Sequence, residues 1–329
     1  MTRSLTGMPF DDIRDLLDTL PPPDDDAAEA VRERNAELAK PVGSLGRLED
    51  LAQWLARWQA NPKPAIDRPL VAIFAATHDV AKRNPSGPQA QDTRAEVELF
   101  AAGGAGVNQL ALGQNAGLKV FDLALDMPTP DICTGEALSE KDCAATMAFG
   151  MESIAGGADL LCVGVTSGGN AVVAAAVACA LFGDKPSNWV SDPADIDTLE
   201  RALAFHANSL KDPLEIMRRI GGRELAAIAG AIIAARVQRI PVLLDGFVAC
   251  TAAAVLQKVE PSALDHCLAA HRSGTVPHDK LLAALGKVPL LDMGISLDDG
   301  SGAALAIGFL KAAAAVHSGM ATREQLGTR

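Results

Sequence analysis

The acidic pair Asp298 and Asp299 is the clearest candidate for acid–base chemistry in this sequence of 329 residues. The pair lies in the segment 296–302, SLDDGSG, between an apolar run and a long stretch that indicates a helix. Two adjacent carboxylates repel each other, which can raise the pKa of one of them and make it a better proton acceptor near neutrality. An Asp directly before a helix is also a common N-cap. The spacing alone therefore leaves both capping and catalysis open.

The segment 164–170, GVTSGGN, is the candidate for holding an anion. It joins a predicted strand to an apolar helix that begins near Ala171. Glycines allow the backbone to approach a ligand, and the free N–H groups in the first turn of a helix attract an anion such as phosphate. A plain turn between strand and helix is the alternative. The sequence contains no G-x-G-x-x-G in this setting and no G-x-x-x-x-G-K-[ST], which counts against dinucleotide-binding and Walker-type sites.

Asp245 and His78 each follow an apolar run. Asp245 comes after four apolar residues, so its carboxylate is expected to lie half inside the core and to need partners there. Its role is either to form a turn or to face a ligand. His78 could orient a substrate or act as an acid or base, and a hydrogen-bonded structural histidine is the equal alternative.

Other familiar catalytic patterns are not present. His266, His271 and His278 are spaced by five and seven residues, unlike the i, i+4 pair of zinc-binding helices, so we predict no metal site. Ser167 does not stand in a G-x-S-x-G motif, and nucleophilic hydrolysis is not supported.

Five β-prone apolar runs predict the strands that position these residues. Helical stretches lie between the runs, an alternation that favours a parallel sheet covered on both faces. Ligands bind beyond the carboxyl ends of the strands in such folds, so the polar segments after the runs are expected to meet there. The runs are 71–76, 118–125, 159–165, 241–247 and 289–295.

Helices are predicted at both ends of the chain. The apolar residues of 10–20 recur at helical spacing, and three prolines at 21–23 end that helix. Acidic residues 24–26 supply an N-cap and a favourable charge for a second helix over 27–38. The run 302–320 is helical again and could pack beside the N-terminal helices as a small domain.

The composition excludes several classes of protein. With 49% hydrophobic and 21% charged residues, the chain is expected to fold. Its formal charge of −12 makes binding to nucleic acid or anionic lipid unfavourable. The N-terminal segment is too acidic for a signal peptide, and the longest strongly apolar run, 171–182, falls short of the roughly 20 residues that span a bilayer. We expect a cytoplasmic protein with no nucleic-acid or membrane partner.

The six cysteines are dispersed in mostly apolar surroundings, and none forms a C-x-x-C pair. This distribution predicts reduced thiols in the core. The residues are Cys133, Cys143, Cys162, Cys179, Cys250 and Cys267.

Four motifs, in order along the chain, resemble the nicotinate-nucleotide dimethylbenzimidazole phosphoribosyltransferase family. They are KPVGSLGRLE at 40–49, GGRELA at 221–226, PVLLDGF at 241–247 and PLLDMG at 289–294. Each motif is weak alone, but the four together are specific, and the resemblance extends from about residue 27 to the C-terminus.

The resemblance implies an α/β fold and a homodimer. The fold would be a Rossmann-like parallel sheet flanked by helices, with a small helical domain built from both chain ends. The small domain would comprise residues 1–60 and 303–329, and the large domain, which binds nucleotide and base, would comprise residues 61–302.

The family displaces nicotinate from the anomeric carbon of nicotinate mononucleotide by a nitrogen of 5,6-dimethylbenzimidazole or a related base. The product is α-ribazole 5′-phosphate, used for the lower ligand of cobalamin, and no cofactor is implied. The family's base is a Glu in an Arg-Leu-Gly-Glu-Gly-x-Gly segment, and Asp299 occupies its position.

The resemblance also implies the substrate-binding residues. His78 and Ser86 would line the azole pocket, and Gly169, Asn170 and Asp245 would lie near the nucleotide. The rest of the segment that carries the base, Gly300, Ser301 and Gly302, would complete the site.

This chain departs from the family motifs at several positions. Val165, Ala171 and Val172 replace an acidic residue and two hydroxyl-bearing residues, and Ala202 replaces a Lys. Altered base specificity and lost catalysis are both compatible with these changes. The second hypothesis is accordingly a catalytically silent paralogue that acts as a ligand-binding, regulatory or assembly subunit.

Overall fold

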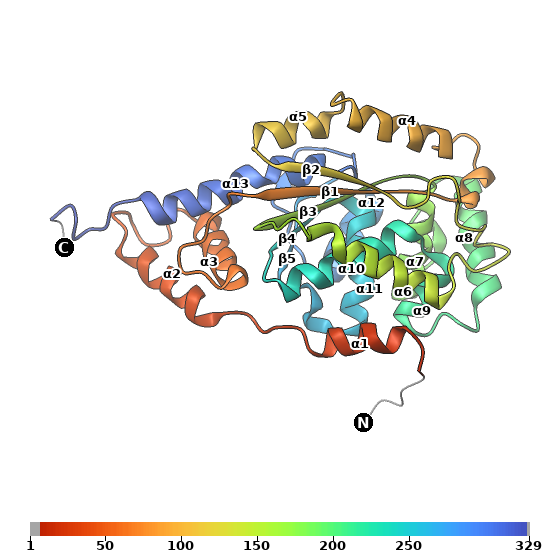
Figure 1. Cartoon of the computed structure of the whole chain (residues 1–329), viewed down its shortest axis with the longest axis horizontal. Helices are drawn as coiled ribbons and strands as arrows, with labels where there is room; N and C mark the ends of the chain where they lie inside the picture. Colours follow the sequence, from red (N-terminus) through yellow and green to blue (C-terminus); the bar gives the residue numbers. More distant parts are fainter. Residues whose placement is uncertain (1–6, 328–329) are drawn as a thin grey trace.

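The structure is a computed structural model that describes residues 7–327, built around a five-stranded parallel sheet in the order β2-β1-β3-β4-β5 (Figure 1). Val71 of β1, for example, lies opposite Leu118 of β2 and Cys162 of β3. The predicted α/β fold with a parallel sheet flanked by helices is confirmed. The strands are β1 (Pro69–Thr77), β2 (Gly117–Asp122), β3 (Leu160–Gly168), β4 (Val242–Leu244) and β5 (Cys267–Ala269).

The predicted strand at 289–295 is wrong as a member of this sheet. Only β7 (Leu291–Asp292) forms there, and it pairs with β6 (His271–Arg272) in a separate two-stranded sheet. The fifth strand of the main sheet is β5, which has three residues and is too short to produce a recognisable apolar pattern.

Alternate residues of the buried strands face two separate cores, which explains why the strand sequences are continuously apolar. Ala72 and Phe74 of β1 belong to the core that the helices α6 to α12 cover. Val71 and Ile73 belong to the core beneath α5 and α13 on the opposite face. Figure 1 shows α4 and α5 on one side of the sheet and α6, α10 and α11 on the other.

Glycines permit the closest helix contact in the larger core. A Cβ on Gly150 of α6 would lie 1.9 Å from the carbonyl oxygen of Ala227, and one on Gly230 of α10 would lie 1.9 Å from that of Met147. The helices around this core are α6 (Glu140–Met151), α7 (Asn170–Phe182), α8 (Pro193–His206), α9 (Pro213–Ile220), α10 (Arg223–Val237), α11 (Gly246–Val259) and α12 (Val276–Leu285).

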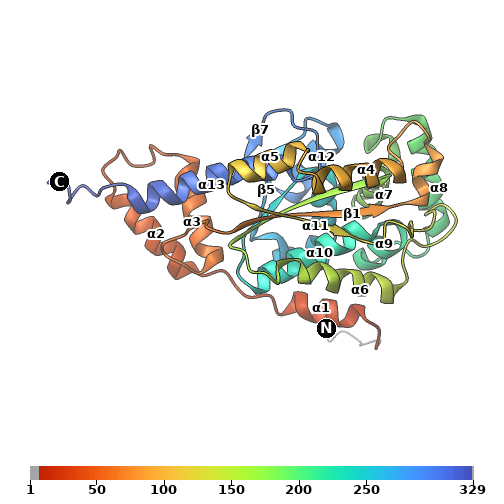
Figure 2. The same ribbon diagram turned by 45° about the horizontal axis from the view of Figure 1, so that its top comes forward.

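The helices of the opposite core come from three parts of the chain. Helices α2 and α3 pack beside the C-terminal half of α13, as Figures 1 and 2 show. Arg34 of α2 donates to the carbonyl oxygen of His317 at 2.8 Å, and Asp24 caps α2 by accepting from the backbone of Ala27. These helices are α2 (Asp25–Glu37), α3 (Arg47–Gln59), α4 (Ala90–Ala101), α5 (Gly106–Gly113) and α13 (Ser301–Gly319).

Helix α1 (Phe10–Asp18) packs apart from the other terminal helices. The backbone N–H of Phe10 donates to Glu140 of α6 at 2.8 Å, and Arg14 forms an ion pair with Asp212. The predicted helices at 10–20, 27–38 and 302–320 are confirmed. The division of the chain into a small domain of residues 1–60 and 303–329 and a large domain of residues 61–302 stays a prediction. Helix α1 belongs to the predicted small domain but packs on the predicted large domain.

Helix α13 alone, within residues 7–327, has the length and apolarity of a membrane-crossing helix. Half of its most apolar stretch is buried, against α3, α5 and β3, as expected for a helix of a protein core. All six cysteines are buried and free, which confirms the prediction of core thiols. The remaining short 3₁₀ turns are η1 (Asp79–Arg83), η2 (Glu152–Ile154), η3 (Pro186–Asn188) and η4 (Pro261–Leu264).

Candidate active site

A cavity of about 520 Å³ opens at the carboxyl end of β3. Its walls are α4, the turn from β3 into α7, and the loop 296–299 before α13. This is the edge at which parallel α/β sheets bind ligands. Asp299 and Asn170, both predicted as site residues, line this cavity.

The turn from β3 into α7 is held by a hydrogen bond to α4. The backbone N–H of Gly168 donates to Oγ1 of Thr93 at 2.8 Å, and a Cβ on Gly168 would lie 2.6 Å from the backbone of Gln89. Gly169 has a φ of +89° and ends the turn directly before α7. Asn170 and Ala171 of the first turn of α7 line the cavity, and backbone N–H groups in a first helical turn have no acceptor within the helix.

The loop that carries the two carboxyls lies directly on β3. The backbone N–H of Val165 donates to the carbonyl oxygen of Asp298 at 2.7 Å. A Cβ on Gly164 would lie 2.4 Å from the backbone nitrogen of Gly300, so only glycine admits the loop at this position. The carboxylate of Asp299 accepts from the backbone of Ser301 at 3.0 Å.

Both carboxyls have raised pKa values. Burial raises the pKa of Asp299, against the hydrogen bonds from Ser301, which lower it. Burial and the neighbouring charge of Asp245 raise the pKa of Asp298 to about 7. A carboxyl with a pKa near the working pH is suited to accept and release a proton.

Every charged side chain that lines the cavity, among the residues described, is acidic. Thr166 at the end of β3 donates a hydrogen bond from its hydroxyl to Glu96 of α4. These carboxyls favour positive charge beside them. The four residues are Asp92, Glu96, Asp298 and Asp299.

The other predicted residues of the 300–302 segment lie directly behind the cavity wall. Gly300, Ser301 and Gly302 begin α13, and Asp245 accepts hydrogen bonds there from the backbone of Gly300 at 2.8 Å and of Ala303 at 2.6 Å. Asp245 is thus buried and supports the loop, and it makes no side-chain hydrogen bond to its own helix α11.

Two predicted residues are not brought to this cavity. His78 is buried, and its ring nitrogens contact Thr129 Oγ1 at 2.6 Å and Glu224 Oε1 at 2.8 Å, as a structural histidine would. Gly222 of the GGRELA motif leaves room for the imidazole ring of His78, because a Cβ added at residue 222 would lie 2.3 Å from Cε1 of that ring. Ser86 is exposed and donates to Asn84 at 2.5 Å.

The candidate site residues named from the sequence do not include Asp92, Thr93 and Glu96. They lie on the first two turns of α4 and line the cavity. Their spacing of one, three and four residues is common on any helix. The signal that could have selected Thr93 and Glu96 is their place in the stretch that resembles the base-binding segment of the family, which Thr93 matches.

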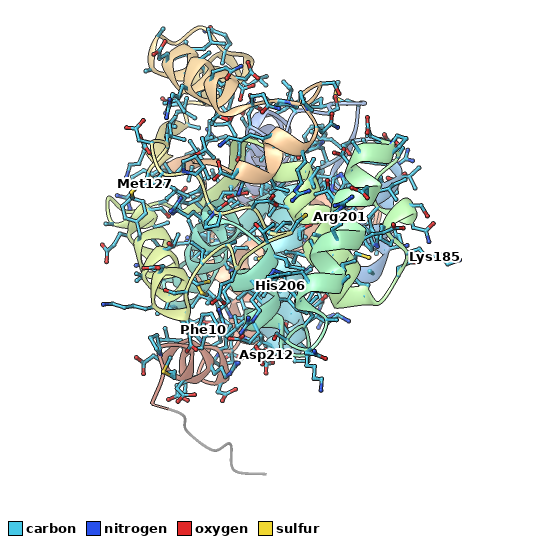
Figure 3. The ribbon with its side chains drawn as sticks, turned by 90° about the vertical axis from the view of Figure 1, so that its right-hand side faces the viewer. Phe10, Met127, Lys185, Arg201, His206 and Asp212 are labelled. Atoms are coloured by element: carbon cyan, nitrogen blue, oxygen red, sulfur yellow. The ribbon has the colours of Figure 1, made fainter. Side chains whose placement is uncertain are left out.

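The positions at which the chain departs from the family motifs have different surroundings. Val165 and Ala171 line the cavity. Ala202 is buried in the larger core. Its neighbour Arg201 on α8, labelled in Figure 3, is exposed and pairs with Asp197 at 2.6 Å. No lining residue of the cavity comes from this part of α8.

A second cavity, of about 550 Å³, lies between the end of β2 and the start of α6. Met127, labelled in Figure 3, and Arg223 are part of its wall. None of the predicted site residues lines it. The cavity at the end of β3 is therefore the better candidate for the active site.

Comparisons with known proteins identify the family of the chain. The family described as Phosphoribosyltransferase matches residues 20–327. The chain is 56% identical to the nicotinate-nucleotide–dimethylbenzimidazole phosphoribosyltransferase of Rhizobium johnstonii, over 98% of each chain. It is also 56% identical to the enzyme of that name from Agrobacterium fabrum, over 98% of this chain and 96% of that one.

A solved structure shows the same fold. The crystal structure of the nicotinate-nucleotide–dimethylbenzimidazole phosphoribosyltransferase from Thermus thermophilus is 33% identical and has a TM-score of 0.86, covering 93% of this chain and 99% of that one. These similarities favour an enzyme over the catalytically silent alternative. The chain belongs to the nicotinate-nucleotide–dimethylbenzimidazole phosphoribosyltransferase family, as its four motifs predict.

Proposed function

We propose that this protein transfers phosphoribose from nicotinate mononucleotide to 5,6-dimethylbenzimidazole or a related azole, forming α-ribazole 5′-phosphate and nicotinate for the lower ligand of cobalamin. The observation that carries the proposal is the position of Asp299, whose carboxyl lines the cavity at the end of β3 opposite the first turn of α7. That arrangement supports a reaction in which a proton acceptor and an anion-binding helix terminus act in one cavity.

The reaction requires one bond to form and one to break at the anomeric carbon. A nitrogen of the azole attacks this carbon, and the bond to nicotinate breaks with its electron pair moving to the departing ring. The azole then carries a positive charge, which the acidic lining of the cavity stabilises. Its N–H proton passes to the carboxylate of Asp299, which leaves the neutral product.

The helix N-terminus is the candidate for the phosphate. Asn170 and Ala171 lie at the cavity in the first turn of α7, where backbone N–H groups are free to donate. Gly169 and the Gly300–Gly302 segment shape the same edge. His78 and Ser86 stay proposed contacts for the azole, although neither lines this cavity.

We also propose a homodimer that works in the cytoplasm without a cofactor, a nucleic-acid partner or a membrane. The formal charge of −12 supports the exclusion of nucleic acid and anionic lipid. Light scattering on the purified protein would test the dimer, with a monomer as the contradicting result.

The central test incubates the purified protein with nicotinate mononucleotide and a panel of azoles and purines. Nicotinate release and new ribosides are followed by mass spectrometry. We expect product with at least one azole, and Asp299→Asn should lower kcat by about 10²- to 10⁴-fold. Asp126→Asn, on a side chain 94% exposed, is the matched control and should keep full activity. No product with any base, beside an active relative, would support the silent alternative.

A further inference from the structure

The second cavity, at the end of β2, has in its wall a guanidinium without a carboxylate partner. Arg223, the first residue of α10, donates from Nη1 to the carbonyl oxygen of Met127 and forms no ion pair within residues 7–327. Arg218 and Arg219 on α9, by contrast, each pair with Glu215. Because a guanidinium has five N–H donors, Arg223 keeps donors for a ligand.

This charge is partly withdrawn from water. Arg223 is half-buried, and burial lowers the pKa of its guanidinium, against the charges of Glu224 and Asp142, which raise it. An arginine remains protonated all the same. A carboxylate would replace the missing water well, since it can accept two parallel hydrogen bonds from one guanidinium. Arg223 therefore favours a ligand that carries a carboxylate.

Three acidic side chains line the same cavity. The charge of Glu136 is compensated by ion pairs with Arg218 and Arg219. Asp122 and Asp142 are exposed, accept hydrogen bonds within their own turns and form no ion pair in the described part of the chain. The wall thus presents unpaired charges of both signs, a half-buried cation and two exposed anions, which do not pair with each other.

Much of the remaining wall is apolar. Leu123 and Leu138 are buried there, whereas the side chains of Met127 and Phe149 are 61% and 46% exposed. The ring of Phe149 meets that of Phe121 edge to face, with centroids 6.1 Å apart. A concave wall of apolar side chains with a few charged groups is typical of a small-molecule site, and the volume of about 550 Å³ is in the usual range.

We propose that this cavity binds an α-amino acid with an apolar side chain. Its carboxylate pairs with Arg223, its ammonium with Asp122 or Asp142, and its side chain packs on the apolar wall. A simple anion would be repelled by the two aspartates, and a simple amine by Arg223. The inference goes beyond the proposed function and does not depend on it, because the two cavities share no lining residue.

The test measures the binding of three related probes to the purified full-length protein by ligand-detected NMR titration. L-phenylalanine carries both charges, 3-phenylpropanoate lacks the ammonium, and 2-phenylethylamine lacks the carboxylate. We expect phenylalanine to bind most tightly. Loss of the carboxylate should weaken binding by about 10- to 100-fold, and loss of the ammonium by about 5-fold, because exposed ion pairs contribute less than a hydrogen-bonded guanidinium pair.

Three results of this titration would overturn the proposal. The first is no saturable binding of phenylalanine in the millimolar range. The second is equal affinity for the three probes, which would mean that the cavity does not recognise their charges. The third is tighter binding of 3-phenylpropanoate than of phenylalanine, which would make the ligand a monocarboxylate instead of an amino acid.

Arg223→Gln tests the pairing with the carboxylate. The variant removes the positive charge and keeps an N–H group that can donate to Met127. Phenylalanine and 3-phenylpropanoate should lose about 10- to 100-fold in affinity, while 2-phenylethylamine should lose none. Arg201→Gln, at an exposed arginine of α8, is the matched control and should bind as the wild type does. Unchanged affinity for phenylalanine in Arg223→Gln would contradict the assignment.

A second variant keeps the inference testable if Arg223→Gln does not fold. Ala145 of α6 is exposed and lines the cavity, so Ala145→Leu fills the space without removing a side-chain hydrogen bond. Phenylalanine binding should be lost in this variant and kept in Ala148→Leu, which alters an exposed alanine of the same helix outside the cavity. Equal binding by Ala145→Leu and Ala148→Leu would place the ligand elsewhere.

Asp299→Asn distinguishes the two cavities. It should bind phenylalanine like the wild type, because Asp299 lines only the cavity at the end of β3. Binding that is lost in Asp299→Asn and kept in Ala145→Leu would place the amino acid in the candidate active site and overturn the proposal. None of these titrations requires turnover, so a protein that forms no α-ribazole 5′-phosphate would overturn the proposed function and leave this result readable.

Discussion

Asp245 and Asp298 cap each other's helices. The carboxyl of each residue accepts a backbone hydrogen bond at the start of the helix that follows the other residue in the chain. Asp245 directly precedes α11, but its carboxylate accepts from Gly300 and Ala303 at the start of α13. Asp298 lies three residues before α13, but its carboxyl accepts from Phe247 in α11. This exchange ties the loop of the catalytic candidates to the junction of β4 and α11, so the position of that loop depends on both helices.

Removing the carboxylate of Asp245 is expected to destabilise the fold. Asp245→Ala leaves the buried N–H groups of Gly300 and Ala303 without an acceptor, which costs about 1–3 kcal/mol for each unsatisfied group. Urea unfolding should show this loss, and Asp245→Asn, which keeps one acceptor oxygen, should be intermediate. Asp292→Ala is the control on an exposed Asp. If Asp245→Ala leaves the free energy of unfolding unchanged, the hydrogen bonds from Asp245 to the start of α13 do not stabilise the fold as we expect.

Gly164→Ala should reduce activity while the protein still folds. The new Cβ would lie 2.4 Å from the nitrogen of Gly300 and 2.6 Å from the carbonyl carbon of Asp299, so the loop must move away from β3. A displacement of about 1 Å at a catalytic group can lower the rate on the order of 10²-fold. Steady-state kinetics measures the effect.

The matched control for that variant is Gly113→Ala, because a Cβ at Gly113 of α5 meets no atom within 4 Å. Its kcat should equal that of the wild type. Equal activity in both variants would show that the loop does not need its close contact with β3.

Acid should destabilise the protein in part through His266. Burial and the charge of Arg236 lower the pKa of His266 to about 3, and its Nε2 donates to the carbonyl oxygen of Ile232. The folded state therefore favours the neutral ring, so this contribution to stability is present above about pH 6.5 and is lost as the pH falls toward 3.

His266→Asn should consequently lose less stability than the wild type between about pH 6.5 and pH 4. Asp298 works in the opposite direction, because its raised pKa makes its contribution largest below about pH 4 and lost as the pH rises through 7. Urea unfolding at several pH values measures both slopes. Parallel stability curves for His266→Asn and the wild type would rule out this role of His266.

The thiols should not react in the folded protein. Burial raises the pKa of all six, to about 11 for Cys133 and Cys179 and higher for the others. Since the thiolate is the reactive form, an aromatic disulfide reagent should titrate none of them rapidly in buffer and all six in denaturant. If one reacts first in the folded state, we expect Cys133 or Cys179. Rapid reaction at Cys162 would contradict the buried sheet.

Local patterns were enough to predict much of the fold. The run at 71–76 lies within β1, and the run at 159–165 overlaps β3 from Leu160 onward, because strands buried on both faces must be apolar at every position. The terminal helices and the cap at Asp24 likewise depend on residues close together in sequence. The four motifs were enough to identify the family, because they are spread along the chain and do not depend on one local contact.

What the sequence determined by itself is therefore the parallel sheet, the helices at both ends and the carboxyl of Asp299 before α13. The tertiary structure decided that β5 completes the sheet, that α1 packs on α6, and that Glu96 faces the end of β3. It also decided that His78 is buried with Glu224 and that Asp245 accepts from Gly300 and Ala303 at the start of α13. These relationships join residues far apart in the chain, and no local periodicity encodes them, because they arise only when the packed sheet brings its helices and loops together.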